Sequence, residues 1–140
     1  MDKLVEFGVI EEKIFAQIGY SDYKPKNYKF KEFLSRDEFN NIMSNSSKVI
    51  THGGTGAILG AIKSGKKVIA VPRLKVLGEH VDDHQIDIVG EFKKMGYIDC
   101  ANTISELELI IRNIDKATFK QYTSNTNSII KSIDQFINSI

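Results

Sequence analysis

The chain has 140 residues, of which 41% are hydrophobic, and this suffices for one packed core. Its 19 lysine and arginine residues balance 18 acidic residues. The chain therefore has no strong positive field that would attract nucleic acid or an anionic membrane as its main partner. One cysteine, Cys100, excludes an intramolecular disulfide framework, and we expect neither secretion nor a membrane span. The composition therefore indicates a cytoplasmic domain that recognises its partners through local sites.

Short β-branched runs alternate with helical patterns, which is typical of βαβ units around a parallel sheet. The chain opens with residues 1–8, which have the pattern of the last turns of a helix, and not with the usual first strand. Ser35 precedes an acidic first turn and is predicted to cap a helix. Strands are predicted at residues 13–18, 48–51, 67–71 and 97–99. Helices are predicted at residues 36–45, 55–64, 82–94, 104–114 and 116–138, and residues 20–33 are predicted as a loop with a short extended piece.

The last predicted helix carries an apolar stripe with a period close to 3.6 residues. This stripe either packs on the domain's own sheet or docks to a partner, and the sequence leaves both open. We expect a single domain over residues 1–140, with an α/β body at 1–115 and an amphipathic helix at 116–140. The stripe consists of Ile129, Ile130, Ile133, Phe136, Ile137 and Ile140.

A glycine-rich turn lies between a predicted buried strand and a predicted helix within residues 49–72. Its glycines are expected to adopt backbone angles that other residues resist and to let an anion approach the main chain. The N–H groups and dipole of the following helix favour negative charge, so the turn predicts a phosphate site. The alternative is a tight turn without a ligand. The expected phosphate contacts are His52, Gly53, Gly54, Thr55 and Gly56.

Two other nucleotide motifs have partial matches in the same region. Residues 60–67 approach the P-loop pattern, but Lys67 replaces its hydroxyl residue and the run lies at a helix end, so we reject this interpretation. A relaxed dinucleotide fingerprint, G-x-G-x-x-x-G, begins at Gly54, and Arg73 suits a 2′-phosphate. An NADP-binding oxidoreductase therefore stays open as a rival.

Residues 73–85 form a second polar segment that follows the next predicted strand. In an open α/β sheet this segment lies beside the glycine turn, at the carboxyl ends of the strands where ligands bind. His80 and His84 are four residues apart, but no H-E-x-x-H pattern or cysteine supports a metal, and none is expected. Hydrogen bonds to sugar or ribose hydroxyls are the preferred role of this segment. Asp82 and Asp83 have the alternative role of solvated first-turn acids.

Three separated motifs resemble the C-terminal domain of family 28 glycosyltransferases. They are H-G-G-T-G-A-I-L at residues 52–59, V-P at 71–72 and H-Q at 84–85. Within that family the chain resembles the donor-binding subunits of split UDP-sugar transferases. These include the UDP-GlcNAc transferase of dolichol-linked chitobiose synthesis and the PssE-type subunits of bacterial capsule and exopolysaccharide synthesis. The PssE-type likeness also involves residues 17–25, 33–35 and 78–85, so the resemblance covers residues 10–90.

The resemblance implies a Rossmann-like parallel sheet flanked by helices, the C-terminal half of a GT-B fold, here without its usual first strand. It implies a donor-binding subunit of a two-component hexosyltransferase that adds a sugar to a lipid-diphosphate-linked acceptor. A membrane-associated partner subunit would bind the acceptor, and the chain would be cytoplasmic, held at the inner face of the membrane through that partner. Enzymes of this kind generally need no metal or other cofactor.

The resemblance also assigns residues. His52, Gly53, Gly54, Thr55 and Gly56 would contact the pyrophosphate of UDP, and His84 and Gln85 would contact the sugar. Glu79 and His80 match the bacterial subunits without a defined role, and no catalytic residue is assigned. Gly60 stands where related single-chain enzymes have an acidic ribose ligand. The alternative functions are a non-catalytic, truncated interaction module and the NADP-binding oxidoreductase.

Overall fold

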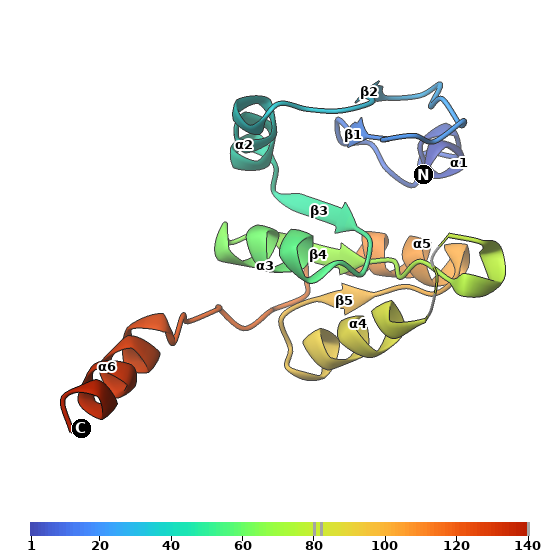
Figure 1. Ribbon diagram of the computed structural model, residues 1–140. Helices are drawn as coiled ribbons and strands as arrows, with labels where there is room; N and C mark the ends of the chain where they lie inside the picture. The colour runs from blue at the N-terminus through green and yellow to red at the C-terminus, as the bar shows by residue number, and fades with distance from the viewer. Residues whose placement is uncertain (80, 82, 140) are drawn as a thin grey trace.

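The computed structural model describes residues 1–79, 81 and 83–139. Its strands form two parallel sheets, one of order β1-β2 and one of order β3-β4-β5. Figure 1 shows the β1–β2 pair on the side of β3 that lies away from β4 and β5. The strands are β1 (Phe15–Gln17), β2 (Lys29–Lys31), β3 (Lys48–Thr51), β4 (Lys67–Ala70) and β5 (Asp99–Cys100). The helices are α1 (Asp2–Glu6), α2 (Arg36–Asn45), α3 (Thr55–Lys63), the 3₁₀ turn η1 (Lys75–Leu77), α4 (His84–Lys94), α5 (Ile104–Asn113) and α6 (Thr126–Ile137).

Strand β4 is the centre of the core because successive side chains point to opposite faces of the sheet. Val68 and Ala70 pack with apolar residues of α3 and α4, whereas Ile69 packs on the other face with α1 and α5. All three are at most 1% exposed. Helices therefore cover both faces of a parallel sheet, and the predicted α/β class is confirmed.

Helix α2 begins as predicted at Ser35. The Ser35 hydroxyl accepts a hydrogen bond from Glu38 N at 3.3 Å, and Glu38 Oε2 accepts one from Ser35 N at 2.9 Å. This reciprocal pair is a capping box, which satisfies N–H groups that the helix itself leaves unpaired.

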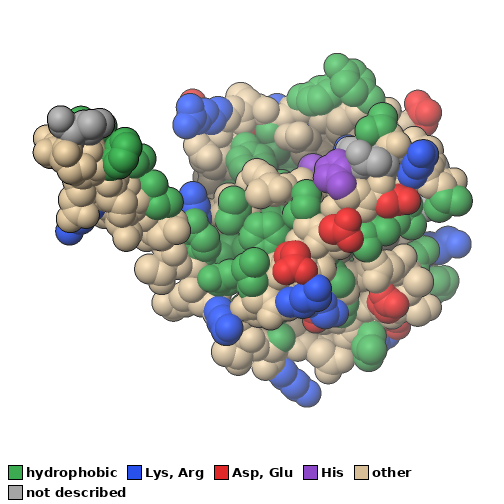
Figure 2. Space-filling model, turned by 60° about the horizontal axis from the view of Figure 1, so that its bottom comes forward, with side chains coloured by type: hydrophobic (Ala, Val, Ile, Leu, Met, Phe, Trp, Pro, Cys, Tyr) green, Lys and Arg blue, Asp and Glu red, His purple; other side chains and the backbone are tan. Residues whose placement is uncertain are grey.

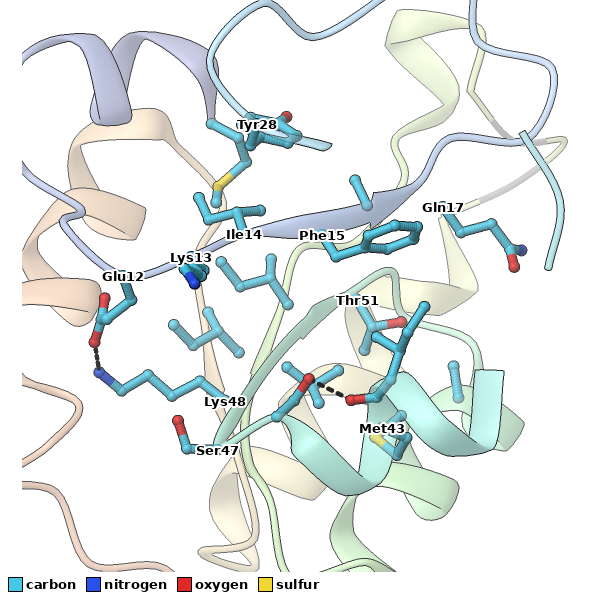
Figure 3. Close-up of a pocket in the computed structure, with 18 of the residues that line it drawn as sticks. Glu12, Lys13, Ile14, Phe15, Gln17, Tyr28, Met43, Ser47, Lys48 and Thr51 are labelled. Carbon is cyan, nitrogen blue, oxygen red and sulfur yellow. Dashed lines mark hydrogen bonds and ion pairs between the residues drawn. The ribbon is translucent and has the colours of Figure 1, made fainter. Parts of the chain in front are cut away.

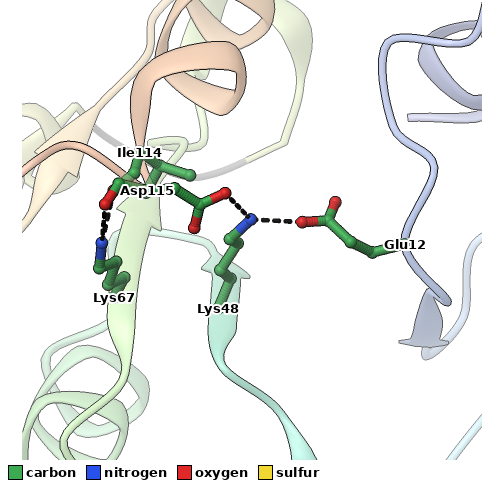
Figure 4. Close-up of polar contacts among 5 residues, drawn as sticks. All are labelled: Glu12, Lys48, Lys67, Ile114 and Asp115. Atoms are coloured by element: carbon green, nitrogen blue, oxygen red, sulfur yellow. Dashed lines mark hydrogen bonds and ion pairs between the residues drawn. The ribbon is translucent and has the colours of Figure 1, made fainter.

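Two lysines tie the end of α5 to the amino ends of β3 and β4 (Figure 4). Lys48 Nζ contacts the carboxylates of Glu12 and Asp115, the latter at 2.7 Å. Lys67 Nζ donates to the carbonyl oxygens of Ile114 and Asp115 at 2.8 and 2.7 Å. Because Glu12 precedes β1 and Lys48 begins β3, the amino ends of these two strands lie next to each other.

Asp2 fixes α1 against the loop that leads into β2. Its carboxylate accepts hydrogen bonds from the Tyr23 hydroxyl at 2.5 Å and from the backbone N–H groups of Lys26 and Asn27 at 2.8 and 2.9 Å. The Tyr23 hydroxyl is the main reason that the pKa of Asp2 falls to about 2. Asp2 is only 8% exposed, so its charge is held by directed hydrogen bonds and not by water.

The prediction of one helix over residues 116–138 is wrong, because α6 begins only at Thr126. The preceding segment is extended: Lys120 N donates to Gly96 O at 2.9 Å, and the Tyr122 ring meets that of Tyr97 edge to face. These contacts hold residues 118–125 across the body in a conformation that a helix does not allow.

Of the two roles that the sequence leaves open for the apolar stripe, packing on the domain's own sheet is not what the structure shows, because its described residues are 49–69% exposed. No residue of α6 is buried, and the helix extends away from the body (Figure 1). Figure 2 shows its hydrophobic side chains at the surface. Across the residues that the structure describes, no helix combines the length and the apolar character that crossing a membrane requires.

The last strand lies at Asp99–Cys100, later than the predicted residues 97–99. Gly96 has a φ of +79°, and Tyr97 N donates to Phe92 O at 3.1 Å, so Tyr97 still belongs to the turn that ends α4. Ile98 is 2% exposed and fills the core before the strand pairs with β4.

Candidate functional site

The glycine turn joins β3 to α3 directly. His52 follows β3, Gly54 occupies the N-cap of α3 with φ −72° and ψ 122°, and the helix begins at Thr55. Because glycine has no side chain, Gly54 leaves the first-turn N–H groups without a side-chain cap. Thr55 and Gly56 are both exposed. The turn therefore presents donors and the positive end of a helix at the carboxyl edge of the sheet.

The expectation that the glycines of this turn adopt unusual backbone angles is wrong, because none of them has a positive φ. Close packing is the reason for glycine at Gly53, whereas at Gly54 a side chain would require the His52 ring to move. A Cβ on Gly53 would lie 2.7 Å from Gln85 Cβ and 3.0 Å from Val89 Cγ2. A Cβ on Gly54 would lie 2.5 Å from His52 Nε2. These glycines let the turn approach helix α4 and the His52 ring.

Gly56 differs from its two neighbours. A Cβ built there meets no atom within 4 Å, so the chain's own packing does not require glycine at this position. The residue lies in the exposed first turn of α3. An open face at a helix N-terminus allows a bound anion to approach the main chain closely.

Gln85 connects the two segments that the sequence predicted to form one site. Its side chain is 4% exposed, and Oε1 accepts hydrogen bonds from Gly53 N at 3.1 Å and from Arg73 N at 3.0 Å. One amide oxygen thus joins the glycine turn, the segment after β4 and the start of α4. The sugar contact assigned to Gln85 stays a prediction, and the geometry adds a role in holding the site's shape.

The loop between β4 and α4 is closed by two carboxylates. Glu79 Oε2 accepts from Leu74 N at 3.1 Å, and Asp83 Oδ1 accepts from Lys75 N at 2.8 Å. Asp83 is therefore not simply a solvated first-turn acid, and the sequence analysis missed its contact across the loop. The position of Asp83 directly before α4 predicts bonds to the N–H groups of that helix, which Asp83 does not make, so no local signal reveals its bond to Lys75.

The predicted residues collect at the amino ends of two helices. His52, Gly53, Gly54, Thr55 and Gly56 surround the start of α3, whereas His84 and Gln85 are the first two residues of α4. His80 and Asp82 lie outside the described residues, so neither the assignment of His80 nor the metal alternative that depends on it is tested. Two helix N-termini held together by Gln85 make a site suited to a polyanion.

Two cavities adjoin this site. A shallow one of about 330 Å³ lies between α3 and α4, where Thr55 and Glu91 contribute to its lining. A larger one of about 680 Å³ lies between β1 and β3 and reaches the glycine turn at His52 (Figure 3). The larger cavity is therefore a neighbour of the turn and is not centred on it.

Two comparisons with known proteins give a match. The family model described as glycosyltransferase family 28 C-terminal domain matches residues 3–140. The chain is also similar to the UDP-N-acetylglucosamine transferase subunit ALG13 of Candida albicans, with 26% identity over 112 residues. That match covers 80% of the chain but 36% of the relative, so the chain spans about a third of the relative's length. No solved structure gives a significant match.

Proposed function

Because this chain belongs to the glycosyltransferase family 28 C-terminal domains, we propose that it is the donor-binding subunit of a two-component, UDP-sugar-dependent hexosyltransferase. Membership of the family confirms the resemblance noted in the sequence. The UDP-sugar is supported by the name of the relative, a UDP-N-acetylglucosamine transferase subunit. The sugar and its linkage depend on fine contacts and are left to experiment.

The observation that carries the proposal is the open first turn of α3. Thr55 and Gly56 are both exposed. A Cβ built on Gly56 would meet no other atom within 4 Å, so this side of the turn is open. In the proposed reaction the UDP diphosphate lies against the N–H groups of this turn. Their fixed dipoles stabilise the charge that grows on the diphosphate as the sugar leaves, which favours the transition state over the ground state.

Side chains around this turn have distinct proposed roles. The Thr55 hydroxyl and the His52 ring contact phosphate oxygens, and His84 at the start of α4 contacts the sugar. Gln85 fixes the positions of the two helix starts relative to each other through its hydrogen bonds to Gly53 N and Arg73 N. No metal or other cofactor is assigned a role in this proposal.

The acceptor belongs to the proposed partner. A membrane-associated subunit would present a lipid-diphosphate-linked sugar, as in capsule or exopolysaccharide synthesis, and would keep this chain at the inner face of the membrane. The word "subunit" in the relative's name supports a divided enzyme. The exposed apolar stripe of α6 supports the existence of a partner surface.

Calorimetry on the purified chain tests the donor site. UDP should bind, whereas ADP and NADPH should bind much more weakly, and a series of UDP-sugars then identifies the donor. His52→Ala should weaken UDP binding. Preference for NADPH would favour the oxidoreductase, and a folded chain without nucleotide affinity would favour the non-catalytic interaction module.

A matched pair of glycine substitutions separates binding from folding. Gly56→Val and Gly60→Val both place a side chain on α3 where the chain itself has open space. Both should therefore leave a folded protein with little change in stability, because valine is at least as favourable as glycine in a helix. Only Gly56→Val should abolish UDP binding, since Gly60 lies a turn farther along the helix. Equal UDP affinity in the two variants would contradict the assignment of the turn.

A further inference from the structure

Arg73 carries a permanent positive charge at the carboxyl edge of the sheet, and the side-chain roles proposed for the donor site leave it unassigned. Strand β4 ends at Ala70, and Arg73 follows after two residues. Arg73 is exposed, whereas Pro72 before it is buried. Ligands of open α/β sheets bind outside the carboxyl ends of the strands, so this charge lies at the edge where a ligand binds.

The backbone at Arg73 is fixed by the same side chain that fixes the glycine turn. Gln85 Oε1 accepts from Arg73 N at 3.0 Å and from Gly53 N at 3.1 Å. The two nitrogen atoms are therefore within two hydrogen-bond lengths of each other, a distance that an arginine side chain is long enough to span. Arg73 also lines the larger cavity together with Thr51 and His52, the two residues that lead into the glycine turn.

The loop around Arg73 has its own backbone donors already bonded. Three consecutive N–H groups, those of Arg73, Leu74 and Lys75, each donate to a side-chain oxygen at 2.8 to 3.1 Å. By contrast, Gly54 leaves the first turn of α3 without a side-chain cap. An anion at this edge can therefore take main-chain hydrogen bonds from α3, but the loop after β4 can offer it only a side chain.

The Arg73 guanidinium is unpaired among the residues that the structure describes. It forms no ion pair and no hydrogen bond with any described residue, whereas Arg112 pairs with Glu108 at 2.9 Å. A guanidinium has its donors in a planar fork that bonds two phosphate oxygens at once. The side chain of Arg73 is therefore available to a phosphate without first giving up a partner within the described chain.

The charge of the proposed ligand favours such a group. The diphosphate of UDP carries several negative charges, whereas the N-terminus of one helix supplies only about half of a positive charge. Helices α3 and α4 both begin at this edge, but the carboxylates of Glu79 and Asp83 lie in the loop between β4 and α4. A full positive charge on Arg73 offsets these carboxylates, so that the helix dipoles can act on the diphosphate.

We propose that the Arg73 guanidinium binds the β-phosphate of UDP through a bidentate pair of hydrogen bonds. The inference rests on the proposed function, because it adds a binding residue to the donor site. The loop of Arg73 leads into α4, where His84 is assigned to the sugar, so the phosphate nearest to Arg73 is the one attached to the sugar. Arg73 therefore makes the site selective for a nucleoside diphosphate over a monophosphate.

A comparison of UDP with UMP tests this contact by calorimetry on the parent chain, Arg73→Gln and Arg73→Lys. Arg73→Gln should weaken UDP binding by about tenfold and leave UMP binding nearly unchanged, because UMP lacks the β-phosphate. Arg73→Lys keeps the charge but not the planar fork, so its UDP affinity should lie between those of the parent and Arg73→Gln. Equal losses for UDP and UMP, or no loss for either, would overturn the proposal.

Lys75→Gln is the matched control for the loss of charge. Lys75 is exposed in the same loop and lines neither of the two cavities that adjoin the site. Its substitution should keep UDP affinity within about twofold of the parent, because an exposed charge without a direct contact is screened. The urea midpoints of all variants should match, since Arg73 N keeps its bond to Gln85. An equal effect of Lys75→Gln and Arg73→Gln on UDP would overturn a direct contact.

Phosphorus NMR at saturating UDP identifies the phosphate that Arg73 contacts. The β-phosphate resonance of bound UDP should differ between the parent chain and Arg73→Gln, whereas the α-phosphate resonance should change little. A purely structural role of Arg73 would not distinguish the two phosphates. A change confined to the α-phosphate would overturn the assignment.

Further arms test other phosphates for the same guanidinium. A loss of NADPH binding relative to NADH in Arg73→Gln would place it at a 2′-phosphate. Weaker binding of geranyl diphosphate with unchanged UDP binding would place it at the lipid diphosphate of the acceptor. Either result overturns the proposal. Unchanged UDP binding in Arg73→Gln overturns this inference alone, whereas a folded parent chain that binds neither UDP nor UMP overturns the proposed donor function as well.

Discussion

The side-chain oxygen of Gln85 lies 3.1 Å from the backbone nitrogen of Gly53 and accepts its hydrogen bond in a buried position. The two residues are 32 positions apart in the chain. The same oxygen also accepts from Arg73 N. The shape of the glycine turn is therefore set by a helix that begins far along the chain, and the two helix N-termini of the site cannot move independently.

Gln85→Met should show how much the side-chain oxygen of Gln85 contributes to stability and to UDP binding. Methionine has a similar length but accepts no strong hydrogen bond, so the N–H groups of Gly53 and Arg73 lose their partner. Leaving buried donors unpaired should lower the free energy of unfolding by about 2–4 kcal/mol. UDP affinity should fall as well. Urea unfolding measures the first effect and calorimetry the second. Gln135→Met, on exposed α6, is the control, and an equal effect of the two substitutions would contradict the role of Gln85.

Gly53→Ala should destabilise the protein, because the added Cβ would lie 2.7 Å from Gln85 Cβ. Displacing the start of α4 should cost about 1–3 kcal/mol in the free energy of unfolding. Gly60→Ala is the matched control, since its Cβ meets nothing within 4 Å and its helical position favours alanine by about 0.5–1 kcal/mol. The urea midpoint should fall for Gly53→Ala and rise for Gly60→Ala. A higher midpoint for Gly53→Ala than for the parent chain would refute the packing argument.

Much of the body follows from local sequence patterns. Residues 36–45 and 48–51 were predicted with the bounds that the structure has, because Ser35 has capping chemistry and the strand is a β-branched run between polar segments. The glycine turn was placed correctly between β3 and α3. These features depend on neighbours in the chain, so periodicity and capping residues suffice to find them.

The features that the sequence did not predict depend on distant contacts. The need for glycine at position 53 comes from Val89 and Gln85, which no local pattern reveals. The extended tail before α6 depends on Lys120 pairing with Gly96, although its sequence allows a helix. Tertiary contacts override local propensity in both cases.

Acid should selectively weaken the attachment of α1. The pKa of Asp2 is about 2 in the folded chain, below its ordinary value of 3.8, so its hydrogen bonds stabilise the fold above pH 4. This contribution is lost as the pH falls from about 4 towards 2. Asp2→Asn should therefore unfold at a lower temperature than the parent at pH 7, and the difference should shrink below pH 4. A difference that is independent of pH between 7 and 2 would contradict a role for the Asp2 charge.

Substitution of the α6 stripe should leave the body intact. Ile133 is 52% exposed and Phe136 is 69% exposed, and no residue of α6 is buried. The double variant Ile133→Ser, Phe136→Ser should therefore change the free energy of unfolding by no more than about 0.5 kcal/mol. Lys131→Ala on the same helix is the control and should have an equally small effect on stability. Because an exposed apolar face favours association, light scattering should show less self-association at high concentration for the double variant than for the control. A large loss of stability in the double variant would mean that the stripe packs on the body in solution, and unchanged association would remove α6 as a contact surface.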